Sequence, residues 1–192
     1  ASAGLAQFII SNGEEAMKKG VAVSYDSRHF SPEFAAVTAS TLASYGIKVY
    51  LSDELRPVPM LSYSVRYFGA FAGVMITASH NPAKYNGYKV YGEDGGQVPP
   101  EAAAIILEAM DKYDDVRNVK MMSIEDAMAT GLVEKFGEKV DAAYTKMLTE
   151  LVIDQDAINR QSDMAIVYTP LHGSGNKPVR RILDKVGFKN VH

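Results

Sequence analysis

Three side chains that can handle phosphate or protons follow one apolar run, in the stretch "GVMITASHNPAKYNGYKVYGEDGGQ". They are Ser79, His80 and Lys89. A serine at the end of a strand, held by a tight Asn-Pro turn, can act as a nucleophile or carry a phosphoryl group. The histidine and the lysine can each supply positive charge to a phosphate dianion or exchange a proton. The pattern therefore predicts that this loop carries out nucleophilic, phosphoryl-transfer or proton-transfer chemistry.

The segments around the loop predict how these side chains are positioned. Residues 73–78 are apolar on both faces, as expected of a central parallel strand. Ligands of open α/β sheets bind at the carboxyl ends of such strands, where Ser79 lies. The Asn86-Gly87 turn would bring Lys89 back towards the serine. Residues 88–98 are predicted to form a β-hairpin with Glu-Asp-Gly-Gly as its turn.

Strand and helix patterns alternate along the rest of the chain. An N-cap serine, Ser31, followed by Pro32 and Glu33, is expected to open one helix. A helix of about sixteen residues should follow Pro99 and Pro100. The segment 114–135 is ambiguous between helical and extended pieces. The other predicted strands are 21–26 and 47–52, and the other predicted helices are 4–19, 31–45, 60–68 and 140–152. This alternation predicts a three-layer α/β/α domain with a mainly parallel, mixed sheet.

The chain also predicts a domain boundary. Residues 1–153 are expected to form the first domain, and the polar segment 154–163 is expected to be a linker. Residues 164–192 then restart the strand–loop–helix–strand pattern, as the first βα unit of a second, similar domain. One βα unit cannot bury both faces of its strand, so we expect the chain to be truncated there. The alternative is an edge strand and a helix added to one domain.

Composition narrows the class of partner. The 192 residues carry a formal net charge of -3 with acids and bases mixed, so no basic stripe suggests nucleic acid. No apolar run has the length of a membrane span, and the N-terminus lacks a signal-peptide pattern. The chain has no cysteine, which excludes disulfides and thiolate metal sites. We expect a cytoplasmic protein without nucleic-acid or membrane partners.

A serine hydrolase is disfavoured by the local pattern. The nucleophile-elbow motif Gly-x-Ser-x-Gly is absent around Ser79. A histidine next in sequence, as His80 is, is badly placed to be the general base of that serine. Adjacent serine and histidine are also common in ordinary turns.

The stretch "TASHNPAKYNGYK" resembles the phosphoserine loop of the α-D-phosphohexomutases, the phosphoglucomutase and phosphomannomutase family. The resemblance covers nearly the whole chain. Four other stretches share it: "VSYDSRHFSPEFA", "RPVPMLSYSVRYFGAFAGVMITASHNP", "NGYKVYGEDGGQ" and, at the start of the second predicted domain, "VYTPLHGSGNKPVRRIL". It implies an enzyme that moves a phosphoryl group between C1 and C6 of a hexose phosphate, through a phosphoserine and a bisphosphorylated sugar.

The resemblance also implies roles for single residues. Ser79 would carry the phosphoryl group, Lys89 would be the general acid/base, and His80 a polar partner of the reacting group. Thr77 and Asn81 would bind substrate or its phosphate. Mg²⁺ would bind an oxygen of the Ser79 phosphoryl group, and a glucose 1,6-bisphosphate-type molecule would be the activator. The partners implied are the hexose phosphate and the remaining domains of the same polypeptide.

Asp26 and Arg28 match the family's early Asp-x-Arg. The resemblance implies that Arg28 is a substrate or phosphate contact at the active site, or a hinge contact. The alternative is a local ion pair that fixes the turn. The residue pattern fits both interpretations.

Several family motifs are missing from the sequence. The aspartate-rich metal loop, Asp-Gly-Asp-Gly-Asp-Arg or close to it, does not occur, and neither does the opening Gly-Thr-x-Gly-x-Arg-Gly segment. We therefore expect an N-terminal fragment that has no mutase turnover by itself. Two other hypotheses remain. One is a non-catalytic α/β module that binds sugar phosphate or another anion, and the other is a scaffold in which Ser79 is a regulatory phosphosite.

Overall fold

The computed structural model of the protein describes residues 1–113 and 115–192. The chain divides into two compact units, Ala1–Phe136 and Gly137–His192. Within the described residues, no helix combines the length and the apolar character needed to cross a membrane.

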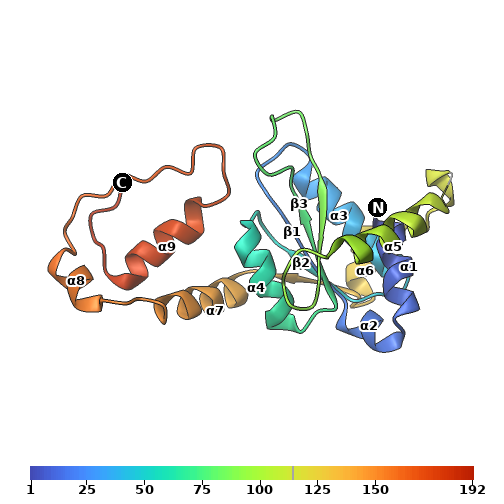
Figure 1. Ribbon diagram of the computed structural model, residues 1–192, viewed down its shortest axis with the longest axis horizontal. Helices are drawn as coiled ribbons and strands as arrows, with labels where there is room; N and C mark the ends of the chain where they lie inside the picture. Colours follow the sequence, from blue (N-terminus) through green and yellow to red (C-terminus); the bar gives the residue numbers. More distant parts are fainter. Residues whose placement is uncertain (114) are drawn as a thin grey trace. The chain divides into compact units, whose positions relative to one another are not determined.

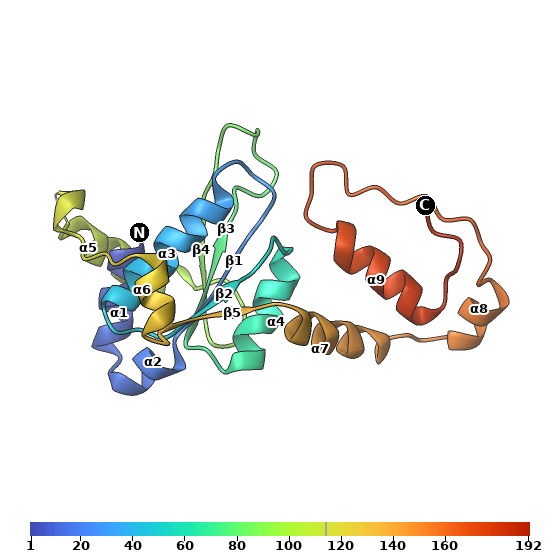
Figure 2. The same cartoon turned by 180° about the vertical axis from the view of Figure 1, so that it is seen from behind.

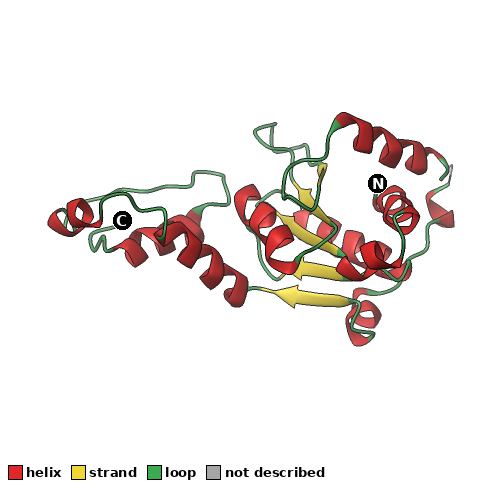
Figure 3. Ribbon diagram, turned by 60° about the horizontal axis from the view of Figure 1, so that its bottom comes forward, coloured by secondary structure: helices red, strands yellow, loops and turns green. Residues whose placement is uncertain are grey.

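The first unit is built on a five-stranded sheet with the order β4-β3-β1-β2-β5 (Figure 1). All neighbours are parallel except β3 and β4, which are antiparallel. Figure 3 shows the strands in yellow between red helices. The strands are β1 (Val21–Tyr25), β2 (Val49–Ser52), β3 (Ala72–Ile76), β4 (Tyr88–Tyr91) and β5 (Val133–Phe136). The predicted mixed, mainly parallel sheet is confirmed.

Helices cover both faces of this sheet, as the two views of Figures 1 and 2 show. In unit one they are α1 (Ser2–Ser11), α2 (Glu14–Lys19), α3 (Ser31–Ser44), α4 (Val58–Phe68), α5 (Pro100–Asp111), the 3-10 turn η1 (Val116–Asn118) and α6 (Ile124–Ala129). Side chains alternate along β3, so Val74 packs into the core under α1 and α3 while Met75 packs against α4. The result is the predicted three-layer α/β/α domain.

Some predicted boundaries were wrong. The single helix expected over 4–19 is two helices, because Gly13 lies between them with φ 90°, outside the helical region. The α5 helix has 12 residues, fewer than the sixteen expected. The ambiguous segment contains η1, α6 and β5, and its first residue, Asp114, lies outside the described residues.

The expected hairpin is present. Strand β4 leads into the Glu-Asp-Gly-Gly turn, where the Gly92 amide donates to the Gly96 carbonyl at 2.8 Å. The returning chain pairs through one antiparallel bridge between Tyr91 and Gln97. Because β4 also pairs with β3, the turn anchors the strand that carries Lys89.

The second unit contains α7 (Glu138–Thr149), α8 (Gln155–Arg160) and α9 (Asn176–Val186). Its extended segments form one parallel bridge, between Ile166 and Val191, instead of full strands. The segment 154–163, expected as a linker, contains α8, and the compact units divide after Phe136 and not after residue 153. The assignment of two family domains stays a prediction.

Candidate active site

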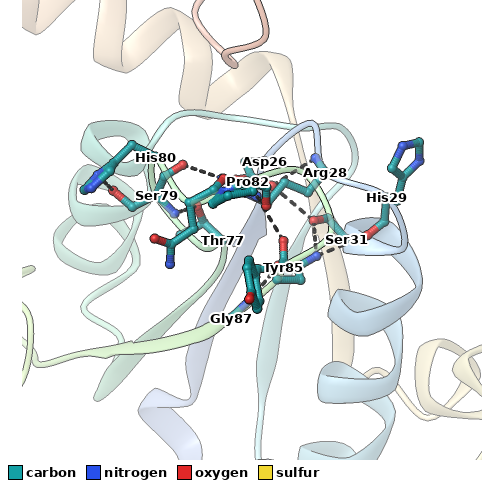
Figure 4. A network of polar contacts seen from close by, with 12 residues as sticks. Asp26, Arg28, His29, Ser31, Thr77, Ser79, His80, Pro82, Tyr85 and Gly87 are labelled. Carbon is teal, nitrogen blue, oxygen red and sulfur yellow. Dashed lines mark hydrogen bonds and ion pairs between the residues drawn. The ribbon is translucent and has the colours of Figure 1, made fainter.

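The backbone turns sharply at the carboxyl end of β3 to present a serine. Thr77 and Ala78 are still buried, whereas Ser79 and His80 are exposed. Ser79 has φ 57°, in the left-handed backbone region that residues other than glycine rarely adopt. Its amide donates to Thr77 Oγ1 at 2.9 Å (Figure 4), so the threonine side chain stabilises the turn.

His80 lies next to the serine hydroxyl. Ser79 Oγ and His80 Nδ1 are 3.3 Å apart, and both side chains are exposed. Either atom can be the donor, depending on which ring nitrogen carries the proton. The pair can therefore exchange a proton through this contact.

Arg28 reaches residues 77–87, here called the serine loop, from the turn after β1. Its Nη1 donates to the carbonyl oxygens of Pro82 at 3.0 Å and Tyr85 at 2.9 Å. Its Nη2 donates to those of Ser79 at 2.6 Å and Asn81 at 2.7 Å. One guanidinium thus holds four carbonyl groups of one loop, as the dashed lines of Figure 4 show in part.

A second layer of hydrogen bonds fixes Arg28. Asp26 Oδ2 lies 3.3 Å from Arg28 Nε, and Asp26 Oδ1 accepts from the Arg28 amide at 3.0 Å and from Ser31 Oγ at 3.1 Å. Asn86 Nδ2 donates to Ser31 Oγ at 2.8 Å and to the His29 carbonyl at 3.2 Å. The ion pair fixes the turn, and the same guanidinium also holds the serine loop.

Ser31 was expected to be an N-cap, and this was wrong. The helix α3 already includes Ser31, and the capping position is Phe30, in the left-handed region with φ 62°. The Ser31 hydroxyl is used by Asp26 and Asn86 instead of by the helix amides. The supporting roles of Ser31 and Asn86 could not be predicted from the sequence pattern, although serine and asparagine are common in such turns.

Gly87 closes the loop against its own start. Thr77 donates its amide to the Gly87 carbonyl at 3.0 Å, and Gly87 donates to Asn86 Oδ1 at 2.8 Å. A Cβ at Gly87 would lie 2.6 Å from the Thr77 carbonyl oxygen. Only glycine allows the returning chain to approach the end of β3 this closely.

Lys89 lies on β4, directly opposite Met75 of β3. Cross-strand partners project from the same face, and Met75 and Tyr91 belong to the cluster under α4. Thr77 follows Met75 by two residues, so Lys89 shares its face with the first residue of the serine loop. Among residues 1–113 and 115–192, the Lys89 ammonium has no hydrogen-bond or ion-pair partner.

Asn81 contributes its backbone to the loop. Its amide donates to the Ala78 carbonyl at 3.1 Å, its carbonyl accepts from Arg28, and its side chain is exposed. The structure thus brings the predicted residues of the loop together around Arg28, and it places Lys89 on the neighbouring strand.

Tyr25 ends β1 beside the Asp26 turn. Burial raises the pKa of its phenol, with nearby Arg56 opposing the shift. Because this pKa is raised, the phenol is protonated at neutral pH. Its hydroxyl donates to the Asp53 carbonyl oxygen at 3.4 Å. This contact links the ends of β1 and β2 next to the serine loop.

The described residues do not form a metal-binding cluster. Within that part of the chain, no three histidine, aspartate or glutamate side chains gather closely enough to hold an ion. Asp26, the carboxylate beside the loop, is already engaged by Arg28 and Ser31. The side chains of residues 1–113 and 115–192 therefore do not fit a magnesium site by themselves.

The fold and the loop define an α/β/α domain with an exposed serine at a strand end. The sequence model of the family described as "Phosphoglucomutase/phosphomannomutase, alpha/beta/alpha domain I" matches residues 2–117. The chain belongs to this family.

Curated relatives agree with that assignment. A protein named phosphoglucomutase from Staphylococcus epidermidis is 44% identical over 168 residues, which cover 88% of this chain and 30% of the relative. A phosphoglucomutase from Staphylococcus saprophyticus is 35% identical over 187 residues, covering 97% of this chain and 33% of the relative. The chain thus spans about a third of the length of these relatives.

Solved structures show the same fold. A Thermus thermophilus protein assigned as a phosphomannomutase superimposes with a TM-score of 0.79 and 26% identity, over 100% of this chain and 39% of that one. The phosphoglucomutase parafusin from Paramecium gives a TM-score of 0.68 at 17% identity, over 98% of this chain and 39% of that one. The second likeness supports the fold alone.

Proposed function

We propose that this chain is the catalytic-serine domain of a phosphoglucomutase or phosphomannomutase. The enzyme would move a phosphoryl group between C1 and C6 of a hexose phosphate. The observation that carries the proposal is Ser79, exposed in a left-handed turn at the end of β3, inside a loop that matches the family. An exposed serine in a hydrogen-bonded turn suits phosphoryl transfer, which depends mainly on positioning and charge neutralisation.

In the first half-reaction, a sugar hydroxyl oxygen forms a bond to the phosphorus carried by Ser79 while the bond from phosphorus to Oγ breaks. Lys89 Nζ accepts the proton of that hydroxyl. The leaving Oγ takes up a proton from His80, whose Nδ1 is 3.3 Å away. The product is a bisphosphorylated sugar and an unmodified serine.

In the second half-reaction the sugar presents its other phosphate. Ser79 Oγ attacks that phosphorus, its proton returns to His80, and the sugar oxygen leaves with a proton from Lys89. Serine is phosphorylated again, and the phosphoryl group has changed position on the sugar. The Lys89 ammonium, unpaired among the described residues, supports this role, because a lysine already paired with a carboxylate would be a poorer proton carrier.

The proposal extends to what the chain works with. Mg²⁺ bound to an oxygen of the Ser79 phosphoryl group would neutralise charge, with its other ligands outside this chain. A glucose 1,6-bisphosphate-type molecule would phosphorylate the serine initially. We also propose that residues 1–153 are the first family domain, that residues 164–192 start the second, and that the enzyme acts in the cytoplasm.

The test replaces Ser79 by alanine in the protein encoded by the complete reading frame that contains this chain. Turnover of glucose 1-phosphate or mannose 1-phosphate should fall by at least about 10³-fold, because the phosphoryl carrier is gone. The matched control is Ser11→Ala, an exposed serine at the end of α1 that bonds only locally, to the Phe8 carbonyl. It should keep wild-type turnover.

The alternatives predict other results. An anion-binding module would bind sugar phosphate without turnover, and Ser79→Ala would barely change its affinity. A phosphosite scaffold would show no sugar-phosphate chemistry in any variant. The isolated 192-residue chain should not turn over hexose phosphates, and detectable conversion by it would contradict that expectation.

A further inference from the structure

We infer that Arg28 is a positioning residue that holds the serine loop in its reactive shape, and that it does not bind the substrate phosphate. The inference deepens the proposed function and rests on it for its kinetic consequences. It assigns the arginine of the Asp-x-Arg turn to the backbone of residues 77–87.

A guanidinium has five N–H donors in one plane. The Nε donor of Arg28 faces Asp26 Oδ2 at 3.3 Å. The two donors of Nη1 face the carbonyls of Pro82 and Tyr85, and the two of Nη2 face those of Ser79 and Asn81. All five directions are therefore occupied, and an incoming phosphate would have to displace an existing partner.

The four carbonyls explain why the loop holds its shape. Ser79 has a backbone conformation that is unfavourable for a residue other than glycine, so contacts with the surrounding structure must stabilise it. The shortest contact of the guanidinium, 2.6 Å, is to the Ser79 carbonyl itself. Hydrogen bonds from a charged donor are stronger than neutral ones. The arginine therefore stabilises the strained residue directly.

The same contacts affect charge around the serine. Carbonyl oxygens are the negative ends of peptide dipoles and would repel a phosphoryl dianion. Four of them, on residues Ser79, Asn81, Pro82 and Tyr85, are held within 3.0 Å of one positive guanidinium. Arg28 thereby neutralises the backbone of the loop without touching the phosphoryl group.

Arg28 is itself held firmly. Its side chain is only 12% exposed, and Asp26 contacts both its Nε and its amide. Lysine cannot replace this arrangement, because an ammonium is a compact point charge and lacks the planar fork that reaches four acceptors. An Arg28→Lys variant therefore keeps the charge and loses the clamp, which separates the two possible roles.

The first experiment measures amide hydrogen–deuterium exchange in the 192-residue chain. Arg28→Lys should raise exchange in residues 77–87 by about tenfold, because hydrogen bonds that hold the loop are lost. The control is Arg66→Lys, an exposed arginine with one carbonyl contact, to Ser62 at 3.4 Å. It should leave residues 77–87 unchanged. Unchanged exchange in Arg28→Lys would overturn the inference.

A second measurement needs no variant, so it holds even where Arg28→Lys fails to fold. Phenylglyoxal modifies accessible guanidinium groups, and peptide mass analysis locates the modified arginines. Arg28, with its donors occupied, should react much more slowly than Arg66. Modification of both arginines at equal rates would show that Arg28 is free, and the inference would be wrong.

The third measurement is kinetic and uses the protein from the complete reading frame. If Arg28 positions the loop, Arg28→Lys and Arg28→Gln should lower kcat to a similar extent, with KM for the sugar phosphate near the wild-type value. If Arg28 binds phosphate, Lys should retain most activity and Gln should mainly raise KM. That second pattern would overturn the inference.

The two proposals can fail separately. Absence of turnover in the wild-type protein would count against the proposed mutase. The exchange and modification experiments would still decide whether Arg28 holds the loop, since neither of them needs activity.

Discussion

Two arginines follow neighbouring parallel strands, and their side chains bind different parts of the chain. Arg28 comes three residues after β1 and Arg56 four residues after β2. Arg56 is buried and serves its own turn, where its Nη1 contacts Ser52 Oγ at 2.6 Å, Asp53 Oδ1 at 2.8 Å and the Glu54 carbonyl at 3.1 Å. Arg28 instead reaches a loop more than fifty residues further along the chain.

The surroundings of the two arginines differ in the same sense. The Arg56 guanidinium lies over the ring of Phe136, the buried last residue of β5, 5.4 Å from the ring centroid. Arg28 faces mainly backbone carbonyls of an exposed loop. A buried arginine packed on an aromatic ring should contribute to the stability of the whole unit, whereas Arg28 should mainly fix the conformation of one loop.

The largest expected effect separates stability from loop order. Arg56→Met should lower the free energy of unfolding by about 2–3 kcal/mol, because buried Ser52 loses its charged donor and the turn loses its cross-link. Urea unfolding followed by circular dichroism measures this, with Arg66→Met as the exposed control. Exchange in residues 77–87 should stay at the wild-type rate, and faster exchange there would remove the contrast between the two arginines.

A smaller effect is expected from the support of Arg28. Ser31→Ala removes the hydroxyl that joins Asp26 to Asn86, so it should cost about 1–2 kcal/mol. It should also raise amide exchange in residues 77–87, though less than Arg28→Lys does. A variant with lowered stability and unchanged exchange would show that Ser31 supports the helix and not the loop.

The smallest effect is expected at another buried serine. Ser24 of β1 is as fully buried as Ser31, but its hydroxyl has no partner among the described residues. Ser24→Ala should change the free energy of unfolding by no more than about 0.5 kcal/mol, because no hydrogen bond is lost. A loss as large as that of Ser31→Ala would mean that burial alone, without the network, explains both results.

Much of the fold could be predicted from the sequence. Strand β3 was located because its residues are apolar on both faces. Helix α3 was located because Pro32 and Glu33 lie at its start, and α4 because Pro57 and Pro59 mark the turn into it. Strand β5 begins in the segment that stayed ambiguous between helical and extended pieces, since its middle residues, Glu134 and Lys135, are exposed and give no apolar run. Such a short, charged segment becomes a strand only because β2 offers it an edge.

The candidate site was predictable in part. The serine loop could be recognised because its side chains form a distinctive motif. The contacts of Arg28 could not, because backbone carbonyls are present at every residue and leave no mark in the sequence. Likewise the left-handed conformation of Ser79 has no local signal, because glycine, the usual residue there, is absent at that position.

The pairing of β5 with β2 has a consequence for folding during synthesis. Val49 of β2 pairs with Val133 of β5, although most of the unit lies between them in sequence. Strands β1, β2, β3 and β4 leave the ribosome well before β5 does, so the edge of β2 stays open until residues 133–136 emerge. Contacts between distant segments form slowly because closing a long loop costs entropy. We expect the unit to complete its sheet last at β5, and a chaperone that protects open strand edges would act on it during that interval.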